Sequence, residues 1–128
     1  MEKLVRDNII DIKERDWESP VYRMTDSIEE KIRFLLFKSV EEYQEYVQSN
    51  SMDAKIEEAA DVLEVYNTII SIAKSEWHHV LAQTYQREKR VFLQDLENTH
   101  ISYDEVLIIQ ERKRQEKWGF EKGIVLTL

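Results

Sequence analysis

The residues of this sequence best suited to chemistry form two short acidic clusters. The first reads Glu-Glu-Tyr-Gln-Glu over residues 41–45, and the second reads Glu-Ala-Ala-Asp over residues 58–61. Within each cluster, acids three positions apart lie on the same face of a helix. If a turn between two antiparallel helices brings the clusters together, their carboxylates form a site of hard oxygen ligands. Such a site suits Mg²⁺ or Mn²⁺ and not zinc.

Acidic residues are common in this chain, so the spacing of the clusters has to be weighed against chance. The 128 residues include 26 Asp and Glu. Two acid pairs separated by any gap of 12–28 residues would arise about two or three times at random, whereas the strict order Glu-Glu-x-x-Glu followed by Glu-x-x-Asp would arise in only a few of about a hundred such chains. The alternative interpretation is that these acids are solvated helix faces that pair with Lys or Arg.

The position of Glu58 around its helix favours the metal site over a solvated face. At about 100° per residue, Glu58 falls within an apolar arc beside Val65, and Asp61 lies at the edge of that arc. A carboxylate among apolar side chains is costly unless it is paired or binds a metal. Two nearby acids, Glu57 and Glu64, fall on the opposite face, which we expect to be polar surface.

Two predicted helices position the clusters. Ser27 and Glu30 form a capping-box pattern, so a helix is expected from there to about Gln48, with apolar residues recurring at helical spacing. Residues 49–51 read as a turn. This turn would fold the following helix back antiparallel to the first.

The second of these helices is expected to begin near Ala54. No Gly or Pro interrupts the chain from there to about Glu97. The segment is therefore either one long helix or two helices with a small break near 74–77.

The remaining segments are predicted to be a connector, a further helix and a short extended stretch. Residues 16–26 contain the single proline and little periodicity, so they read as a connector. Ser102 and Glu105 form another capping box, which opens a helix that should stop at Gly119, the natural left-handed residue after a helix. The apolar segment 124–126 is expected to be extended.

Composition favours one helical domain over residues 1–128. Apolar residues make up 42% of the chain, and it contains only two glycines and one proline. An all-β protein of this size needs many turns, which those residues supply. We therefore expect an all-α helical bundle, and the absence of cysteine fits a reducing, cytoplasmic location.

Charge and hydropathy narrow the possible partners. The net charge is −8, whereas a nucleic-acid binder usually shows a basic footprint, so no nucleic-acid partner is expected. No apolar run approaches the roughly 20 residues that cross a bilayer, and no membrane partner is expected. An acidic protein that acts on phosphates needs something to offset repulsion, and a divalent cation would do so.

Three segments carry a family resemblance. Residues 3–7 read Lys-Leu-Val-Arg-Asp, residues 60–65 read Ala-Asp-Val-Leu-Glu-Val, and residues 119–126 read Gly-Phe-Glu-Lys-Gly-Ile-Val-Leu. Together with the acidic clusters, they resemble the all-alpha NTP pyrophosphatase superfamily, which includes MazG, dimeric dUTPases and phosphoribosyl-ATP pyrophosphohydrolase. The match is sharpest with the phosphoribosyl-ATP pyrophosphohydrolase-like, house-cleaning branch.

The resemblance implies a fold, a reaction and a set of site residues. It implies a MazG-like helical bundle that converts a nucleoside triphosphate to a monophosphate and pyrophosphate, with water activated by Mg²⁺ attacking at the α–β linkage. The implied metal ligands are Glu42, Glu45, Glu58 and Asp61, and Glu41 would be an additional acid near the site. The candidates for binding the outer phosphates are Lys3, Arg6, Lys113, Arg114, Lys117 and Lys122.

The first long helix also predicts self-association. Its apolar residues fall on two sides, with Leu35 and Val40 on one and Phe34 and Phe37 on the other. One chain of this size has few elements to cover both, and exposed apolar patches usually mark interfaces. We expect a homodimer or a higher homo-oligomer.

Two other functions compete with the enzyme. One is a non-catalytic acidic helical module that binds a protein partner. The other is an acidic protein that mimics DNA, which would need acids spread at phosphate-like spacing, whereas those at 111–117 alternate with Lys and Arg. Mg²⁺ should raise the melting temperature of the enzyme and leave that of the interaction module unchanged.

Overall fold

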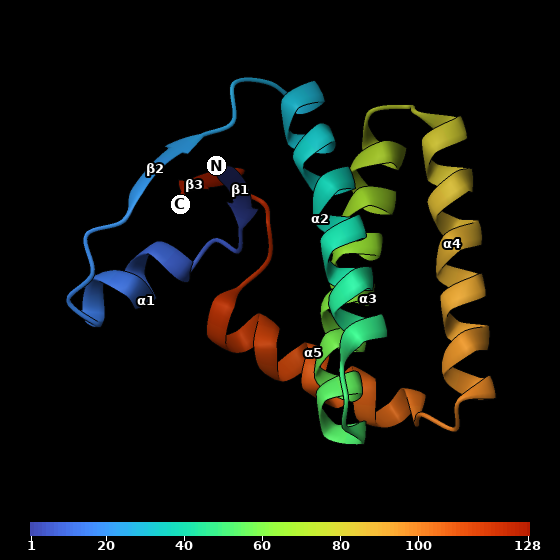
Figure 1. Cartoon of the computed structure of the whole chain (residues 1–128). Helices are drawn as coiled ribbons and strands as arrows, with labels where there is room; N and C mark the ends of the chain where they lie inside the picture. Colours follow the sequence, from blue (N-terminus) through green and yellow to red (C-terminus); the bar gives the residue numbers. More distant parts are fainter.

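Three long helices lie side by side, and a small sheet packs beside them (Figure 1). The computed structural model describes residues 1–128. The chain is 68% helical, and its elements follow one another in this order: β1 (Glu2–Val5), α1 (Ile9–Arg15), β2 (Val21–Met24), α2 (Ile28–Gln48), α3 (Met52–Ser75), α4 (His79–Asn98), α5 (Tyr103–Lys117) and β3 (Ile124–Thr127).

Serine residues cap the N-termini of α2, α3 and α5. Ser27, Ser51 and Ser102 each accept a hydrogen bond from the backbone N–H three residues further on, which satisfies a donor that the first helical turn leaves free. These caps confirm the predicted starts of α2, α3 and α5. The long segment after the turn divides in two, because α3 ends at Ser75 and α4 begins at His79.

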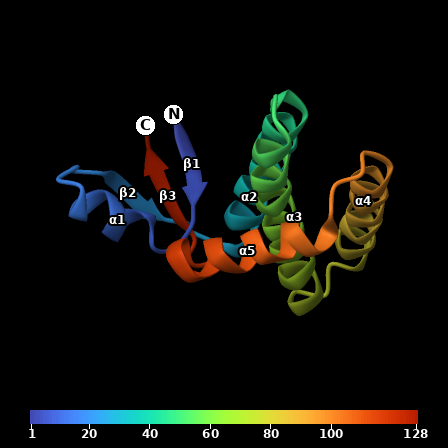
Figure 2. The same ribbon diagram turned by 90° about the horizontal axis from the view of Figure 1, so that it is seen from below.

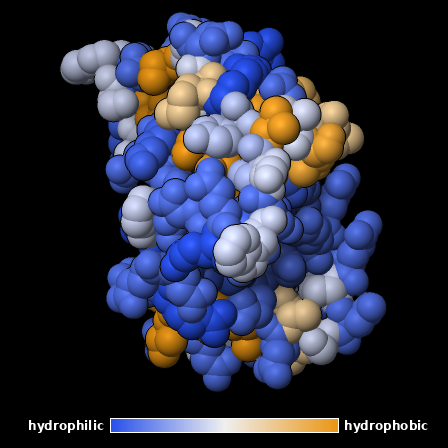
Figure 3. Space-filling view, turned by 90° about the vertical axis from the view of Figure 1, so that its left-hand side faces the viewer, coloured by the Kyte–Doolittle hydropathy of each residue, from blue (hydrophilic) through white to orange (hydrophobic).

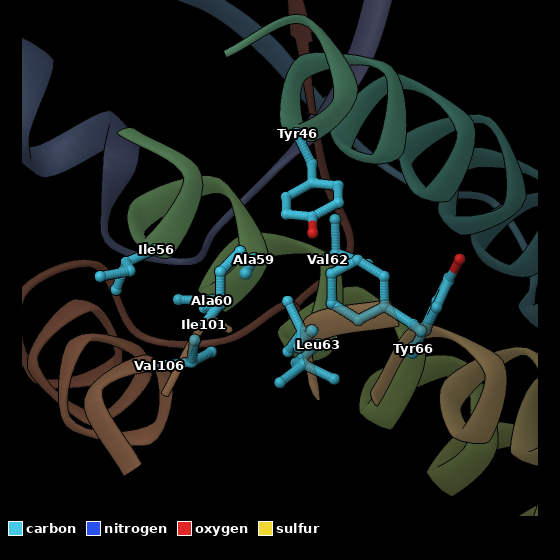
Figure 4. Packing of buried hydrophobic residues seen from close by; sticks show 11 residues of the cluster. Tyr46, Ile56, Ala59, Ala60, Val62, Leu63, Tyr66, Ile101 and Val106 are labelled. Atoms are coloured by element: carbon cyan, nitrogen blue, oxygen red, sulfur yellow. The ribbon is translucent and has the colours of Figure 1, made fainter. Parts of the chain in front are cut away.

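Helix α3 is the central element. It packs against α2, α4 and α5, and α5 crosses beneath it (Figure 2). Its side chains contribute most of the largest apolar cluster (Figure 4), whose buried members are Tyr46, Ile56, Ala59, Ala60, Val62, Leu63, Tyr66, Phe92, Leu96, Ile101 and Val106. Because α3 has neighbours on several sides, most of its circumference is covered.

The two ends of the chain form a three-stranded antiparallel sheet in the order β1-β3-β2. Leu4 pairs with Val125, and Val125 pairs on its other side with Arg23. Leu4 and Val125 pack with Leu35, Val65 and Phe120 in a second apolar cluster. This cluster joins the sheet to α2 and α3 and thereby holds both termini near the acidic residues.

The mostly helical fold is confirmed, and the small sheet is an addition to the expected bundle. The chain is mostly helical, and 124–126 is extended as predicted, but two further strands pair with it. The segment expected to be a connector, 16–26, contains β2. Strands of four residues are too short to show the alternation by which a strand is recognised in sequence.

The end of α5 also differs in detail from the prediction. The helix ends at Lys117, and the residue with positive φ is Trp118, at 65°. Gly119 is not left-handed, whereas Gly123 is, with φ at 69°.

The surface is largely polar. On the side that carries the sheet and α1, hydrophilic residues predominate, with small groups of hydrophobic side chains between them (Figure 3). None of the helices is both long enough and apolar enough to span a membrane.

Candidate metal and phosphate site

Carboxylates from α2 and α3 converge between the two helices. Glu42, Glu58 and Asp61 each place one carboxylate oxygen within 4.8 Å of the others. Glu42 is buried, and the other two are half-buried. Glu45, one turn after Glu42, lies close enough to Glu42 and Glu58 to influence the pKa of both. The fold thus brings together three of the four carboxylates expected to bind a metal, and it leaves Glu45 beside them with an exposed side chain.

Burial and mutual repulsion raise the pKa of these carboxyl groups. Burial raises the pKa of Glu42 to about 7, and Asp61 and Glu45 add to this effect while the Lys38 ammonium opposes it. Burial also raises the pKa of Glu58, with further repulsion from Asp61 and Glu42. The pKa of Glu45 rises for the same first reason. The cluster therefore resists holding several negative charges without a nearby cation.

Two oxygens of the cluster are left without hydrogen bonds. Glu42 Oε2 and Glu58 Oε2 are buried and have no partner in the protein. A buried acceptor without a partner costs about 1–3 kcal/mol. Carboxylate oxygens are the preferred ligands of Mg²⁺ and Mn²⁺, so the residues present fit a bound divalent cation.

Asp61 is held by two cations. Its Oδ1 accepts a hydrogen bond from Arg6 Nη2 at 3.0 Å, and its Oδ2 accepts one from Lys113 Nζ at 3.0 Å. Arg6 also donates to the carbonyl oxygen of Trp118 and lies over the Phe120 ring, 5.7 Å from its centroid. Arg6, directly after β1, and Lys113 on α5 thus fix the orientation of the Asp61 carboxylate.

A basic cleft of about 240 Å³ opens beside the acidic cluster. Glu42 and Asp61 form one side of it, and apolar residues such as Phe120 form part of its wall. Its cationic lining residues are Lys3, Arg6, Lys13, Lys38 and Lys117. Acceptors for a cation and donors for phosphate oxygens therefore meet at one place.

The structure sorts the basic residues named from the sequence. Lys3, Arg6 and Lys117 line the cleft. Arg114 and Lys122 are not among its lining residues, because Arg114 lies against Glu64 on another side of α3 and Lys122 lies over the Trp118 ring.

Two cationic residues that line this cleft were not among the candidates from the sequence. Lys38 lies one turn before Glu42, with its Nζ 3.4 Å from Glu42 Oε1, and this i, i+4 spacing was a usable signal. Lys13 is on α1 and reaches the cleft only because the N-terminal segment folds back.

The acids flanking the cluster differ in their surroundings. Glu41 is partly exposed and lies 3.9 Å from both Lys3 and Lys38, at the rim. Glu57 and Glu64 were expected on a polar surface, but α5 covers that side of α3. Glu57 pairs with Arg112 and Lys113 at 2.9 and 3.1 Å, and Glu64 is buried.

Comparison of the chain with protein-family models, with curated proteins and with solved structures finds no match in any of the three.

Proposed function

We propose that this chain is a Mg²⁺-dependent nucleotide pyrophosphohydrolase. It would cleave the α–β linkage of a nucleoside triphosphate to give a nucleoside monophosphate and pyrophosphate. The observation that carries the proposal is the pair of buried, unbonded oxygens of Glu42 and Glu58 beside a cleft of Lys and Arg side chains. A polyphosphate that carries a divalent cation needs both kinds of group at one place.

Four carboxylates would hold the cation, namely Glu42, Glu45, Glu58 and Asp61. When bound, Mg²⁺ or Mn²⁺ would offset the negative charge of the phosphate oxygens and lower the pKa of a nearby water. Glu41 lies at the rim, close to Lys3 and Lys38.

The basic side chains have two tasks in this proposal. Arg6 and Lys113 bind the two oxygens of Asp61, so they orient that carboxylate. Lys3, Lys13 and the other lysines of the cleft, Lys38 and Lys117, donate hydrogen bonds to the outer phosphates. This division makes Arg6 and Lys113 positioning residues, whereas the lysines contact the substrate.

The sequence resemblance supports the same reaction. The motifs at 3–7, 60–65 and 119–126 resemble a branch of the all-alpha NTP pyrophosphatase superfamily that is associated with house-cleaning. We therefore propose that the helical bundle is of MazG type, that the substrates include non-canonical nucleotides, and that the chain forms a homodimer or a higher homo-oligomer.

The test is a panel of NTPs, dNTPs and modified nucleotides assayed with Mg²⁺, with Mn²⁺ and with EDTA. We expect at least one nucleotide to yield pyrophosphate and a monophosphate, and only with a metal present. Release of orthophosphate alone, or no turnover with either metal, would overturn the proposal and leave the non-catalytic interaction module as the better interpretation.

A further inference from the structure

A second cleft lies on another side of α3 from the lysines of the phosphate site. Its volume is about 310 Å³. Four polar side chains and Ile72 of α3 line it, and the rest of the lining comes from Lys31 of α2, Arg114 of α5 and the segment 119–121. The residues used below are Glu64, Asn67, Ser71, Arg114, Gly119 and Phe120.

Glu64 is a buried carboxylate with hydrogen-bonding capacity left over. Its side chain is 5% exposed, and its Oε1 is buried and makes no hydrogen bond. Arg114 Nε lies 3.3 Å from that oxygen, but the alignment does not produce a hydrogen bond. A buried charge is retained at a cost unless it is satisfied, so this carboxylate is suited to accept N–H groups of a ligand in the cleft.

The cleft adjoins the phosphate site. Phe120 lines both, and Arg6, which binds Asp61, lies over the Phe120 ring. On α3, Val65 lines the phosphate cleft and its neighbour Glu64 lines the second one. A molecule with phosphates at one end and a hydrogen-bonding group at the other fits this arrangement.

We propose that this second cleft binds the base of the nucleotide and favours guanine, an inference that rests on the proposed function. A carboxylate only accepts hydrogen bonds, and it has two oxygens side by side. Guanine offers two adjacent donors, N1–H and the 2-amino group. Adenine and cytosine place a ring acceptor beside their amino group, and uracil flanks its single N–H with two carbonyls.

The rest of the lining matches the remaining polar edge of guanine. The guanidinium of Arg114 is half-exposed and lies beside Glu64, and O6 and N7 are the acceptors of guanine that Arg commonly binds. Asn67 and Ser71 add donors and acceptors along the same side of α3. Gly119 keeps one wall open, since a Cβ there would meet nothing within 4 Å.

The test compares GMP with IMP, which lacks only the 2-amino group. Binding is measured by calorimetry with the full chain, in Mg²⁺ and in EDTA. A hydrogen bond to a charged group corresponds to about a tenfold difference in affinity. We expect the parent to bind GMP about tenfold more tightly than IMP, and Glu64→Gln to reduce that ratio to about threefold or less.

Two further variants test whether the base binds in this cleft and whether the loss of any acidic residue changes the GMP-to-IMP ratio. Gly119→Leu fills the cleft from a position with ordinary φ and free space, so it should fold normally and weaken GMP binding at least tenfold. Glu111→Gln, an exposed mid-helix change on α5, should leave the GMP-to-IMP ratio unchanged.

The outcomes separate the two proposals. If Glu64→Gln keeps the parent ratio, or if the parent does not distinguish GMP from IMP, the base cleft is wrong even when nucleotides are hydrolysed. If GMP is favoured and Glu64→Gln removes the preference, but no triphosphate is hydrolysed, the cleft stands and the pyrophosphohydrolase assignment fails.

Discussion

Glu58 and Glu64 lie on the same helix, six residues apart, and both are acids in largely buried surroundings. Helical phase identified Glu58, because it falls among apolar residues of α3. The same reasoning placed Glu64 on a polar surface, and that was wrong. The phase of one helix shows which residues share a face but not which neighbour covers that face, and here α5 covers it.

For the single residue Glu58, we expect the change Glu58→Gln to abolish pyrophosphate release and to stabilise the metal-free protein. The cluster carboxylates repel one another, and removing one charge relieves that repulsion while keeping the shape. The gain should be about 1 kcal/mol, or about 3–6 °C in melting temperature measured in EDTA.

The matched control for Glu58→Gln is Glu111→Gln. Glu57, which the sequence places on a polar face, is unsuitable as a control because it pairs with Arg112 and Lys113, and Lys113 also binds Asp61. Glu111 is exposed on α5 and forms no ion pair. Equal melting temperatures for the two variants in EDTA would show that Glu58 lies in no repulsive cluster.

The raised pKa of Glu42 predicts how the stability of the metal-free protein depends on pH. Its pKa is about 7 in the folded chain against an ordinary 4.5, so the folded state binds the proton more tightly than the unfolded state. The free energy of unfolding should therefore fall as pH rises from about 4.5 to about 7, by up to about 3 kcal/mol from this group. Urea unfolding in EDTA across that range measures it, and Glu42→Gln should flatten the dependence. A stability that rises with pH in the parent would contradict the prediction.

Among the elements, the long helices were predictable and the sheet was not. Caps such as Ser27 and Ser102 and the periodic apolar residues specify α2, α3 and α5 locally. The strands pair residues that are far apart in the chain, for example Leu4 with Val125, and nothing in either short segment specifies its partner. The basic cleft depends on that pairing, which explains why Lys13 was missed.

The junction before β3 allows a prediction at the level of the element. Gly123 has φ at 69°, and a Cβ there would collide with the Thr25 side chain. Gly123→Ala should therefore destabilise the protein by about 1–3 kcal/mol, measured by urea unfolding. Gly119→Ala is the control, because a Cβ at Gly119 meets nothing within 4 Å and should change stability by less than about 0.5 kcal/mol. Equal effects of the two changes would mean that the turn before β3 is not built as described.

The whole molecule leaves apolar side chains exposed on α2, some of them in a groove between α2 and α4. Phe37 is 67% exposed and Val40 and Val47 are each 56% exposed, and Val40 and Val47 line a groove of about 560 Å³ between these helices. Patches of this kind usually mark interfaces, so a homo-oligomer stays the prediction.

Light scattering at micromolar concentration measures the predicted association. We expect at least a dimer, and we expect Val40→Glu to shift it toward monomer. Val80→Glu, at an exposed position at the start of α4 and outside the groove, should leave the mass unchanged. A monomeric parent would refute the prediction.

The proposed reaction depends on whether the acidic cluster binds a divalent cation. The melting temperature of the purified chain, stripped with EDTA and then titrated with Mg²⁺, tests this most directly, because a ligand that binds only the folded state stabilises it increasingly as the ligand concentration exceeds the dissociation constant. We expect the melting temperature of the parent to rise with Mg²⁺ concentration, with a smaller rise or none in Glu58→Gln and the parent response in Glu111→Gln. No rise in the parent, or the same rise in the parent and in Glu58→Gln, would contradict a metal site at Glu42, Glu45, Glu58 and Asp61.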